Sequence, residues 1–232
     1  MGCSFCASGL LQRQRNLTSG EMLGQVLAIN SILKEEGSKV SHIVVMGTGE
    51  PFDNYENLMD FVHICNHPKG LEIGARHITV STCGIVDKII KYADENLQIN
   101  LAISLHASNN ELRSKLMKIN KAYDINQVIE AVKYYVKKTD RRVTFEYIML
   151  AGTNDSLENA KELAKLLKGI NCFVNLIPYN EVSTLPYKRT SRDQIRIFAD
   201  YLKNNGVNVT IRKEFGKDID AACGQLRAKV KE

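Results

Sequence analysis

The sequence predicts an α/β protein built on a parallel sheet, and its hydrophobic pattern carries that prediction. Short apolar runs recur along the 232 residues and alternate with segments whose apolar residues follow helical spacing. Most of the runs are continuous, which is typical of strands that are covered on both faces and are therefore usually parallel. Their spacing suits βα units, which span about 30 or more residues. An open doubly wound sheet and a barrel both satisfy this pattern.

The expected strands end in residues that suit ligand binding. Ligands sit at the carboxyl ends of the strands in both architectures. Glycine or polar residues follow four strands, namely Gly49-Glu50, Ser81-Thr82, Ser104 with His106, and Asn180. One such loop alone would be ordinary turn chemistry, so the recurrence is what indicates a site. The expected strands are 43–46, 78–82, 101–105, 143–149, 173–177 and 207–211.

Capping signals mark where several helices begin. In a capping box, the first side chain accepts a hydrogen bond from the backbone three residues later. Glycine can end such helices, and a further helix is expected over residues 56–65. The length allows one large domain or two small ones, and with no repeat, linker or low-complexity tract we expect residues 1–232 to form one. The expected capping pairs are Thr18/Glu21, Asp124/Gln127, Asp155/Glu158 and Ser191/Gln194, with Gly37, Gly169 and Gly206 as ends.

Composition limits the cellular setting. With 44% hydrophobic residues the chain can bury a sizeable core. No apolar run approaches the ~20 residues of a membrane span, and no signal peptide leads the chain. The six cysteines are irregularly spaced, unlike a secreted disulfide framework. We therefore expect a reducing cytoplasm and no membrane partner. The net charge of +5 fits an ordinary surface or a polyanionic partner such as RNA.

Cys3 and Cys6 form a CxxC pair at the start of the chain. A thioredoxin-like redox pair needs a preceding strand, for which the sequence leaves no room. A zinc site needs two further ligands. The spacing alone therefore leaves a cluster site, a zinc site and a redox site open. The remaining cysteines are isolated in the sequence: Cys65, Cys83, Cys172 and Cys223.

The residues from Gly2 to Gly9, followed by Arg15-Asn16-Leu17-Thr18, resemble the CxxxCxxC loop of radical SAM enzymes. They are most similar to the RlmN/Cfr family of rRNA adenine methyltransferases. In that family three thiolates hold a 4Fe-4S cluster, whose open iron binds S-adenosylmethionine (SAM). Here only Cys3 and Cys6 are present, and the first cysteine would lie two positions before Met1.

The resemblance implies a radical SAM-type partial (β/α)6 barrel whose beginning has been removed. Its first strand, and the family's amino-terminal RNA-binding domain, would then be missing. An opened barrel of this kind would have an unpaired strand edge, which is an aggregation liability.

The resemblance also assigns SAM contacts. Gly49 and Glu50 match the family's SAM-binding pair, and Ser81 matches the next contact. Ser104, Leu105 and His106 match the third contact, and Asn180 matches the last. Without the resemblance, His106 would be read as a hydrogen-bonded histidine at a strand end.

Cys223 lies in Ala222-Cys223-Gly224-Gln225-Leu226, which matches the family's ACGQL signature. Considered alone, a single cysteine is more often a small buried hydrophobe. Arg212 and Lys213 could favour its thiolate if they lie near it. In the family, one SAM methylates this cysteine. A second SAM yields a 5′-deoxyadenosyl radical, which activates the S-methyl group for addition to adenine. Product release there requires a second cysteine, which forms a transient disulfide with Cys223, and a base. Both of these residues are expected upstream of Met1.

The implied activity is methylation of carbon 2 of an adenosine in 23S rRNA, with tRNA as a further substrate and flavodoxin or ferredoxin as electron donor. Pro51 favours this reaction over Cfr-like methylation of carbon 8. Basic residues over 188–196 suit phosphate contacts or a solvated helix start. Two alternatives stay open. One is a non-catalytic SAM- or RNA-binding fragment, and the other is an unrelated α/β enzyme with a zinc or redox site.

Overall fold

One parallel sheet organises the protein. A computed structural model describes residues 1–10 and 14–213. Its six strands lie in the order β1-β2-β3-β4-β5-β6, and every pair is parallel. The α/β class and the parallel sheet are thus confirmed. The strands are β1 (Ile43–Val45), β2 (Ile78–Thr82), β3 (Asn100–Ser104), β4 (Val143–Met149), β5 (Cys172–Pro178) and β6 (Asn208–Ile211).

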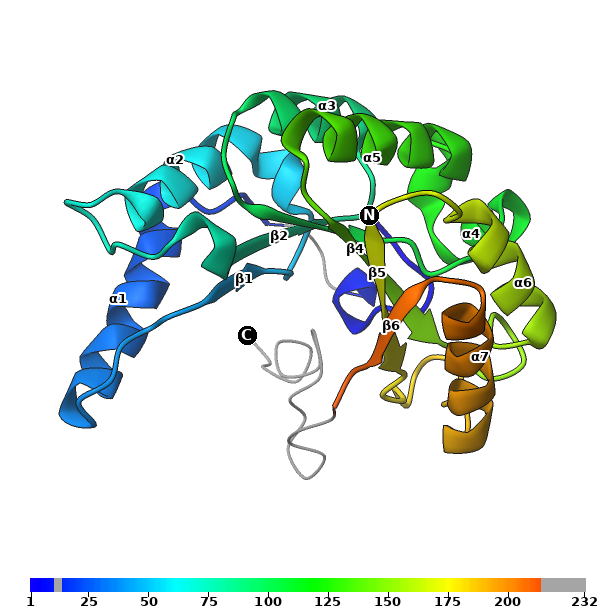
Figure 1. Cartoon of the computed structure of the whole chain (residues 1–232). Helices are drawn as coiled ribbons and strands as arrows, with labels where there is room; N and C mark the ends of the chain where they lie inside the picture. Colours follow the sequence, from blue (N-terminus) through cyan, green and yellow to red (C-terminus); the bar gives the residue numbers. More distant parts are fainter. Residues whose placement is uncertain (11–13, 214–232) are drawn as a thin grey trace.

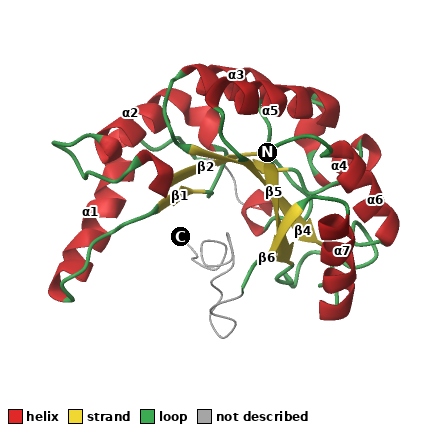
Figure 2. Cartoon of the chain, viewed as in Figure 1, coloured by secondary structure: helices red, strands yellow, loops and turns green. Residues whose placement is uncertain are grey.

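The helices form an arc around the outer face of the curved sheet (Figure 1). Figure 2 shows the strands inside this arc, with α1 at one end and α7 at the other. The helices are α1 (Ser19–Glu35), α2 (Tyr55–Asn66), α3 (Val86–Asp94), α4 (Asn110–Leu116), α5 (Ile125–Thr139), α6 (Leu157–Leu166) and α7 (Arg192–Asn204). The short 3-10 helices are η1 (Ala7–Leu10), η2 (Pro51–Asn54), η3 (Ala75–His77) and η4 (Lys118–Lys121).

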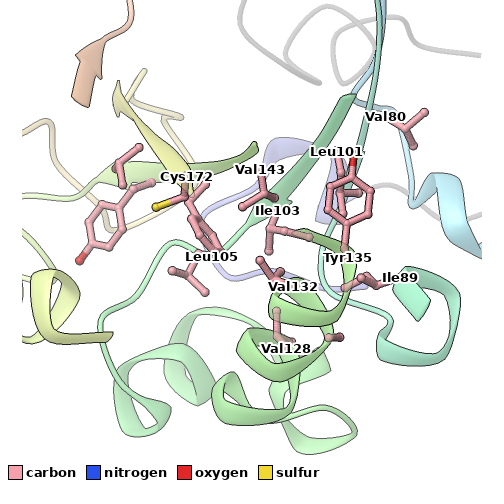
Figure 3. Close-up of a cluster of buried hydrophobic side chains, with 14 of the residues drawn as sticks. Val80, Ile89, Leu101, Ile103, Leu105, Val128, Val132, Tyr135, Val143 and Cys172 are labelled. Atoms are coloured by element: carbon pink, nitrogen blue, oxygen red, sulfur yellow. The ribbon is translucent and has the colours of Figure 1, made fainter. Parts of the chain in front are cut away.

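The main core lies between the sheet and the helices. Figure 3 shows Leu101 and Ile103 of β3 opposite Val128 and Val132 of α5, and each of these side chains is at most 1% exposed. The Tyr135 hydroxyl donates to the Ile99 carbonyl at 3.0 Å, which satisfies the polar end of a buried ring. This packing fixes the strands and therefore the loops at their carboxyl ends.

The inner face of the sheet differs from the expectation that helices cover both faces. Strand register places Ser104, Glu146, Asn175 and Thr210 side by side across β3, β4, β5 and β6. Along β5, buried residues alternate with partly exposed ones, which is the pattern of a strand with one face on the core. The helices thus cover the apolar outer face, whereas the inner face carries a polar row.

Local capping explains most helix starts. The boxes at Thr18 and Asp124 are confirmed, and Ser191 accepts from the backbone of Gln194. The prediction for Asp155 is wrong, because Ser156 caps α6 and forms the box with Asn159. The Asp155 carboxylate instead accepts from Gly152 N and from the Thr190 hydroxyl.

The sheet is open among the described residues, with β1 and β6 at its edges. Among these residues β1 pairs only with β2, and Val44 on β1 is 58% exposed. All six strands follow the cysteine loop, and a further strand before that loop stays a prediction. No described helix has the length and apolar character to span a bilayer. Cys223 lies outside the described residues, and within them the cysteines are free thiols: Cys3, Cys6, Cys65, Cys83 and Cys172.

Candidate active site

The cysteine loop lies against the carboxyl ends of the strands. Ser4 N donates to the Leu116 carbonyl of α4 at 2.9 Å. The Phe5 ring contacts the His106 ring edge-on, with centroids 5.0 Å apart. The Tyr179 hydroxyl, just beyond β5, donates to the Phe5 carbonyl at 3.4 Å. The loop is therefore held by α4, by the turn after β3 and by the segment after β5.

Cys3 and Cys6 share one short turn within this loop, in which Cys6 N donates to the Cys3 carbonyl at 3.3 Å. Burial, followed by the charge of Cys6, raises the pKa of the Cys3 thiol to about 11. Thiolates are the ligands of iron–sulfur clusters and are also common at zinc. Among the residues that the structure describes, no three His, Cys, Asp or Glu side chains are grouped to hold a metal ion. The loop therefore supplies two thiol ligands of the three in the family pattern.

Glu50 ties the loop after β1 to the loop after β2. One carboxylate oxygen accepts from Phe52 N at 3.0 Å, and the other accepts from Cys83 N at 2.7 Å. Gly49, with φ at +118°, lies in a backbone region that favours glycine. Because both oxygens of Glu50 already accept a hydrogen bond, only their remaining lone pairs are available to a ligand ammonium.

The end of β2 is buried beneath these loops. Ser81 is 6% exposed, and the Thr82 hydroxyl accepts from Gly84 N at 3.1 Å. Cys83 packs in an apolar cluster with Phe5, and burial, followed by the charge of Glu50, raises the pKa of its thiol. These surroundings are those of a buried cysteine that fills space next to the site.

The predicted SAM-contacting turn after β3 is held by β4. Leu105 N and His106 N both donate to the Glu146 carbonyl, at 3.1 and 3.2 Å. His106 has φ at +57°, and its Nδ1 accepts from Ile148 N at 3.1 Å. The assigned tautomer therefore carries its proton on Nε2. Burial, followed by the positive charge of Arg113, lowers the pKa of His106 to about 3, so the ring is neutral at pH 7.

Asn154 anchors the same turn and was missed as a site residue from sequence. Its Nδ2 donates to the carbonyls of His106 at 2.9 Å and Ile148 at 2.7 Å. Its Oδ1 accepts from Leu150 N at 2.8 Å, and the residue is fully buried. The sequence signal was an asparagine in the turn five residues after a strand, and asparagine is also common in ordinary turns.

Glu146 is a second site residue that the sequence reasoning did not identify. Its side chain stands beside Ser104 on the inner face and accepts from Asn175 Nδ2 at 2.8 Å. It is 5% exposed, and burial raises the pKa of its carboxyl group. A charged residue in the middle of an apolar strand was the available signal.

Asn180 lies two residues beyond β5 and is exposed. The neighbouring basic segment lies on the same side of the sheet, because Ala151 N, beyond the end of β4, donates to the Lys188 carbonyl at 2.9 Å. Lys188 and Arg196 are each 72% exposed, and each lies near an acidic side chain. Such surface pairs are weak and can rearrange.

The structure therefore brings Cys3 and Cys6 together with the turn at His106. The charge of Arg113 lowers the pKa of the Cys3 thiol, and the charge of Glu50 raises it. The arrangement places two thiols, which are soft metal ligands, beside the polar rim, by which we mean the buried polar residues at the carboxyl ends of β2 and β3. This arrangement suits a bound cluster with a polar ligand next to it. Whether Cys223 joins this site stays a prediction.

Three comparisons relate the chain to known proteins. The Radical SAM superfamily model matches residues 1–167. A protein of Bacillus cytotoxicus named "Probable dual-specificity RNA methyltransferase RlmN" is 61% identical over 229 residues, covering 99% of this chain and 63% of the relative. The relative of the same name from Bacillus thuringiensis gives the same values. The chain thus spans 63% of the length of these curated relatives.

Solved structures agree on the fold. The crystal structure of a radical SAM methyltransferase from Sphaerobacter thermophilus has a TM-score of 0.95 and 50% sequence identity, covering 98% of this chain and 67% of that one. Streptococcus suis SuiB bound to S-adenosylmethionine has a TM-score of 0.66 at 18% identity, covering 95% and 49%. At that identity the likeness shows the fold alone.

Proposed function

This chain belongs to the radical SAM superfamily, and from that membership we propose that it is the catalytic core of a methyltransferase acting on carbon 2 of an adenosine in 23S rRNA. Members of the superfamily use a 4Fe-4S cluster and SAM. The observation that carries the proposal is the contact of the cysteine loop with the turn at His106, which sets thiol ligands beside a polar rim. The RlmN relatives support the choice of substrate.

Cys3 and Cys6 would hold two irons of the cluster, which when bound supplies the electron that cleaves SAM. The protein's own contribution is to orient the sulfonium ligand and to exclude water. Glu50 fixes the two loops after β1 and β2 relative to each other through Phe52 N and Cys83 N. Gly49 allows a ligand to approach the backbone closely.

We further propose that Ser81, Ser104, Leu105, His106 and Asn180 contact SAM. Ser81 and His106 are buried, and the neutral His106 ring presents an Nε2–H donor. Such preorganised groups bind without reorganising. Asn180 is exposed and can reach a ligand at the rim.

Cys223 is proposed to carry the methyl group to the RNA. Carbon 2 of adenine is electron-poor, so direct displacement from a sulfonium fails there, and a thiol carrier provides a radical route. The basic residues from Lys188 to Arg196 would contact RNA phosphates, since Lys188 lies beside the end of β4 and Lys188 and Arg196 are exposed. We propose a cytoplasmic setting, tRNA as a further substrate and flavodoxin or ferredoxin as reductant.

The test uses the full-length protein, purified anaerobically and reconstituted with iron and sulfide. It is incubated with a 23S rRNA fragment, SAM and a flavodoxin reducing system, and the nucleosides are analysed by mass spectrometry against methyladenosine standards. We expect 2-methyladenosine from the rRNA and the same product from tRNA. Formation of 8-methyladenosine would establish the Cfr-like reaction instead.

Cysteine variants distinguish the roles. Cys223→Ala is expected to abolish RNA methylation while leaving SAM cleavage measurable, whereas Cys65→Ala, a buried cysteine of α2, should retain methylation. Zinc in place of iron in the purified protein would overturn the proposal in favour of an unrelated site. Binding of RNA or SAM without any methyl transfer would indicate a non-catalytic role.

A further inference from the structure

Arg113 is a buried cation beneath the cysteine loop. It lies on α4 and is 0% exposed. Arginine is almost never fully buried unless its charge is paired, because moving an ion out of water costs several kcal/mol. An anionic partner is therefore expected close to the guanidinium.

The guanidinium has only neutral partners among the described residues. One terminal nitrogen donates to Asn120 Oδ1 at 2.8 Å and to the Tyr123 carbonyl at 3.1 Å, and the other donates to the Cys83 carbonyl at 2.6 Å. Its Nε is buried and has no hydrogen-bond partner. No carboxylate of the described residues forms an ion pair with Arg113, and the charge of Asp124 acts on it only without such a contact. Its hydrogen bonds satisfy most of its donors but do not neutralise its charge.

The cysteine loop is the neighbouring place where negative charge can be held. Ser4 N donates to the carbonyl of Leu116, three residues after Arg113 on the same helix. The Cys83 carbonyl that accepts from Arg113 belongs to a residue in the same apolar cluster as Cys3 and Cys6.

We propose that Arg113 is a positioning residue that supplies the counter-charge for the anionic, thiolate-ligated cluster held at Cys3 and Cys6. The inference rests on the proposed function. A cluster bound by thiolates is anionic, and its reduction adds one more negative charge. A buried cation nearby stabilises the reduced form more than the oxidised form and therefore raises the reduction potential, which depends on local charge.

The readout is the midpoint potential of the cluster in the reconstituted full-length protein, measured by EPR-monitored redox titration. Arg113→Met is expected to make reduction about tenfold less favourable, which is a shift of about 59 mV to more negative potential for one electron. Arg113→Lys keeps the charge but loses the fork of hydrogen bonds, so its potential should stay near that of the wild type.

Lys115→Met is the matched control, because it removes a positive charge from the same helix at a side chain that is 69% exposed and paired with Glu111. Solvent screens that charge, so the potential should not move. Iron content and circular dichroism establish loading and folding of each variant. If Arg113→Met does not fold, Arg113→Gln replaces it, since an amide can still donate to the Cys83 carbonyl.

The outcomes separate the inference from the proposed function. A wild-type protein that binds no cluster would refute both. A loaded protein whose potential is the same in the wild type and the neutral variants would refute the role of Arg113 alone. Equal shifts in Arg113→Lys and the neutral variants would also refute it, because hydrogen-bond geometry rather than charge would then set the potential.

Discussion

Replacing Asn154 with alanine tests whether a single buried amide holds the turn after β3. The substitution removes the two Nδ2 hydrogen bonds to the carbonyls of His106 and Ile148, and the one that Oδ1 accepts from Leu150 N. Each buried group left without a partner costs about 1–3 kcal/mol. At the lower end of that range, the free energy of unfolding should fall by about 3 kcal/mol. This loss corresponds to a decrease in Tm of about 6–12 °C for a domain of this size.

Urea unfolding followed by far-UV circular dichroism measures this loss. Asn204→Ala, at the exposed carboxyl end of α7, is the control and should change stability by less than about 0.5 kcal/mol. A loss below about 1 kcal/mol for Asn154→Ala would refute the reasoning, because it would mean that water or rearranged backbone satisfies the freed groups.

Three further substitutions test other parts of the site. Glu50→Ala should lower the free energy of unfolding by about 2 kcal/mol, since two backbone donors lose their acceptor. Glu50→Gln should lower it by about half as much, and equal losses in the two variants would contradict this account. Gly84→Ala should be more destabilising in thermal melts than Gly152→Ala. Both glycines have positive φ, but a Cβ at Gly84 would lie 2.9 Å from a Val128 methyl, whereas nothing lies within 4 Å at Gly152. The pKa of His106 is about 3 in the folded state and has an ordinary value of 6.5. As the pH falls, the unfolded chain therefore takes up this proton at a higher pH than the folded protein does. Stability should therefore fall as the pH drops from 6.5 toward 3, by at most about 1.4 kcal/mol per pH unit. In His106→Asn, urea titrations should show a shallower slope, and an unchanged slope would count against a buried neutral ring.

The helix starts and strands that depend on residues close together in the sequence could be predicted from it. The capping boxes at Thr18 and Asp124 need only residues three positions apart, and both form as expected. The continuous apolar runs located the strands because each run packs its outward side chains on the helices. Asp155 failed as a cap because its partner, the Thr190 hydroxyl, lies 35 residues away in the sequence.

The parts of the site that were missed depend on tertiary contacts. Arg113 is one of several basic residues in the sequence, and only the packing of α4 under the cysteine loop shows that it is buried. Glu146 likewise becomes part of the inner face only through its register with Ser104 and Asn175. Spacing along the chain carries no information about either contact.

The order of the sheet has a consequence for how the protein matures. Each strand pairs only with the strands that precede and follow it in the chain, so the sheet can extend one strand at a time as synthesis proceeds. The cysteine loop precedes all six of these strands in the chain but cannot settle early. Its contacts with Tyr179 and Tyr187 join residues 174 and 183 positions apart. A segment that is synthesised before the sheet is thus among the last to reach its place, and iron delivery should follow synthesis of the sheet rather than precede it.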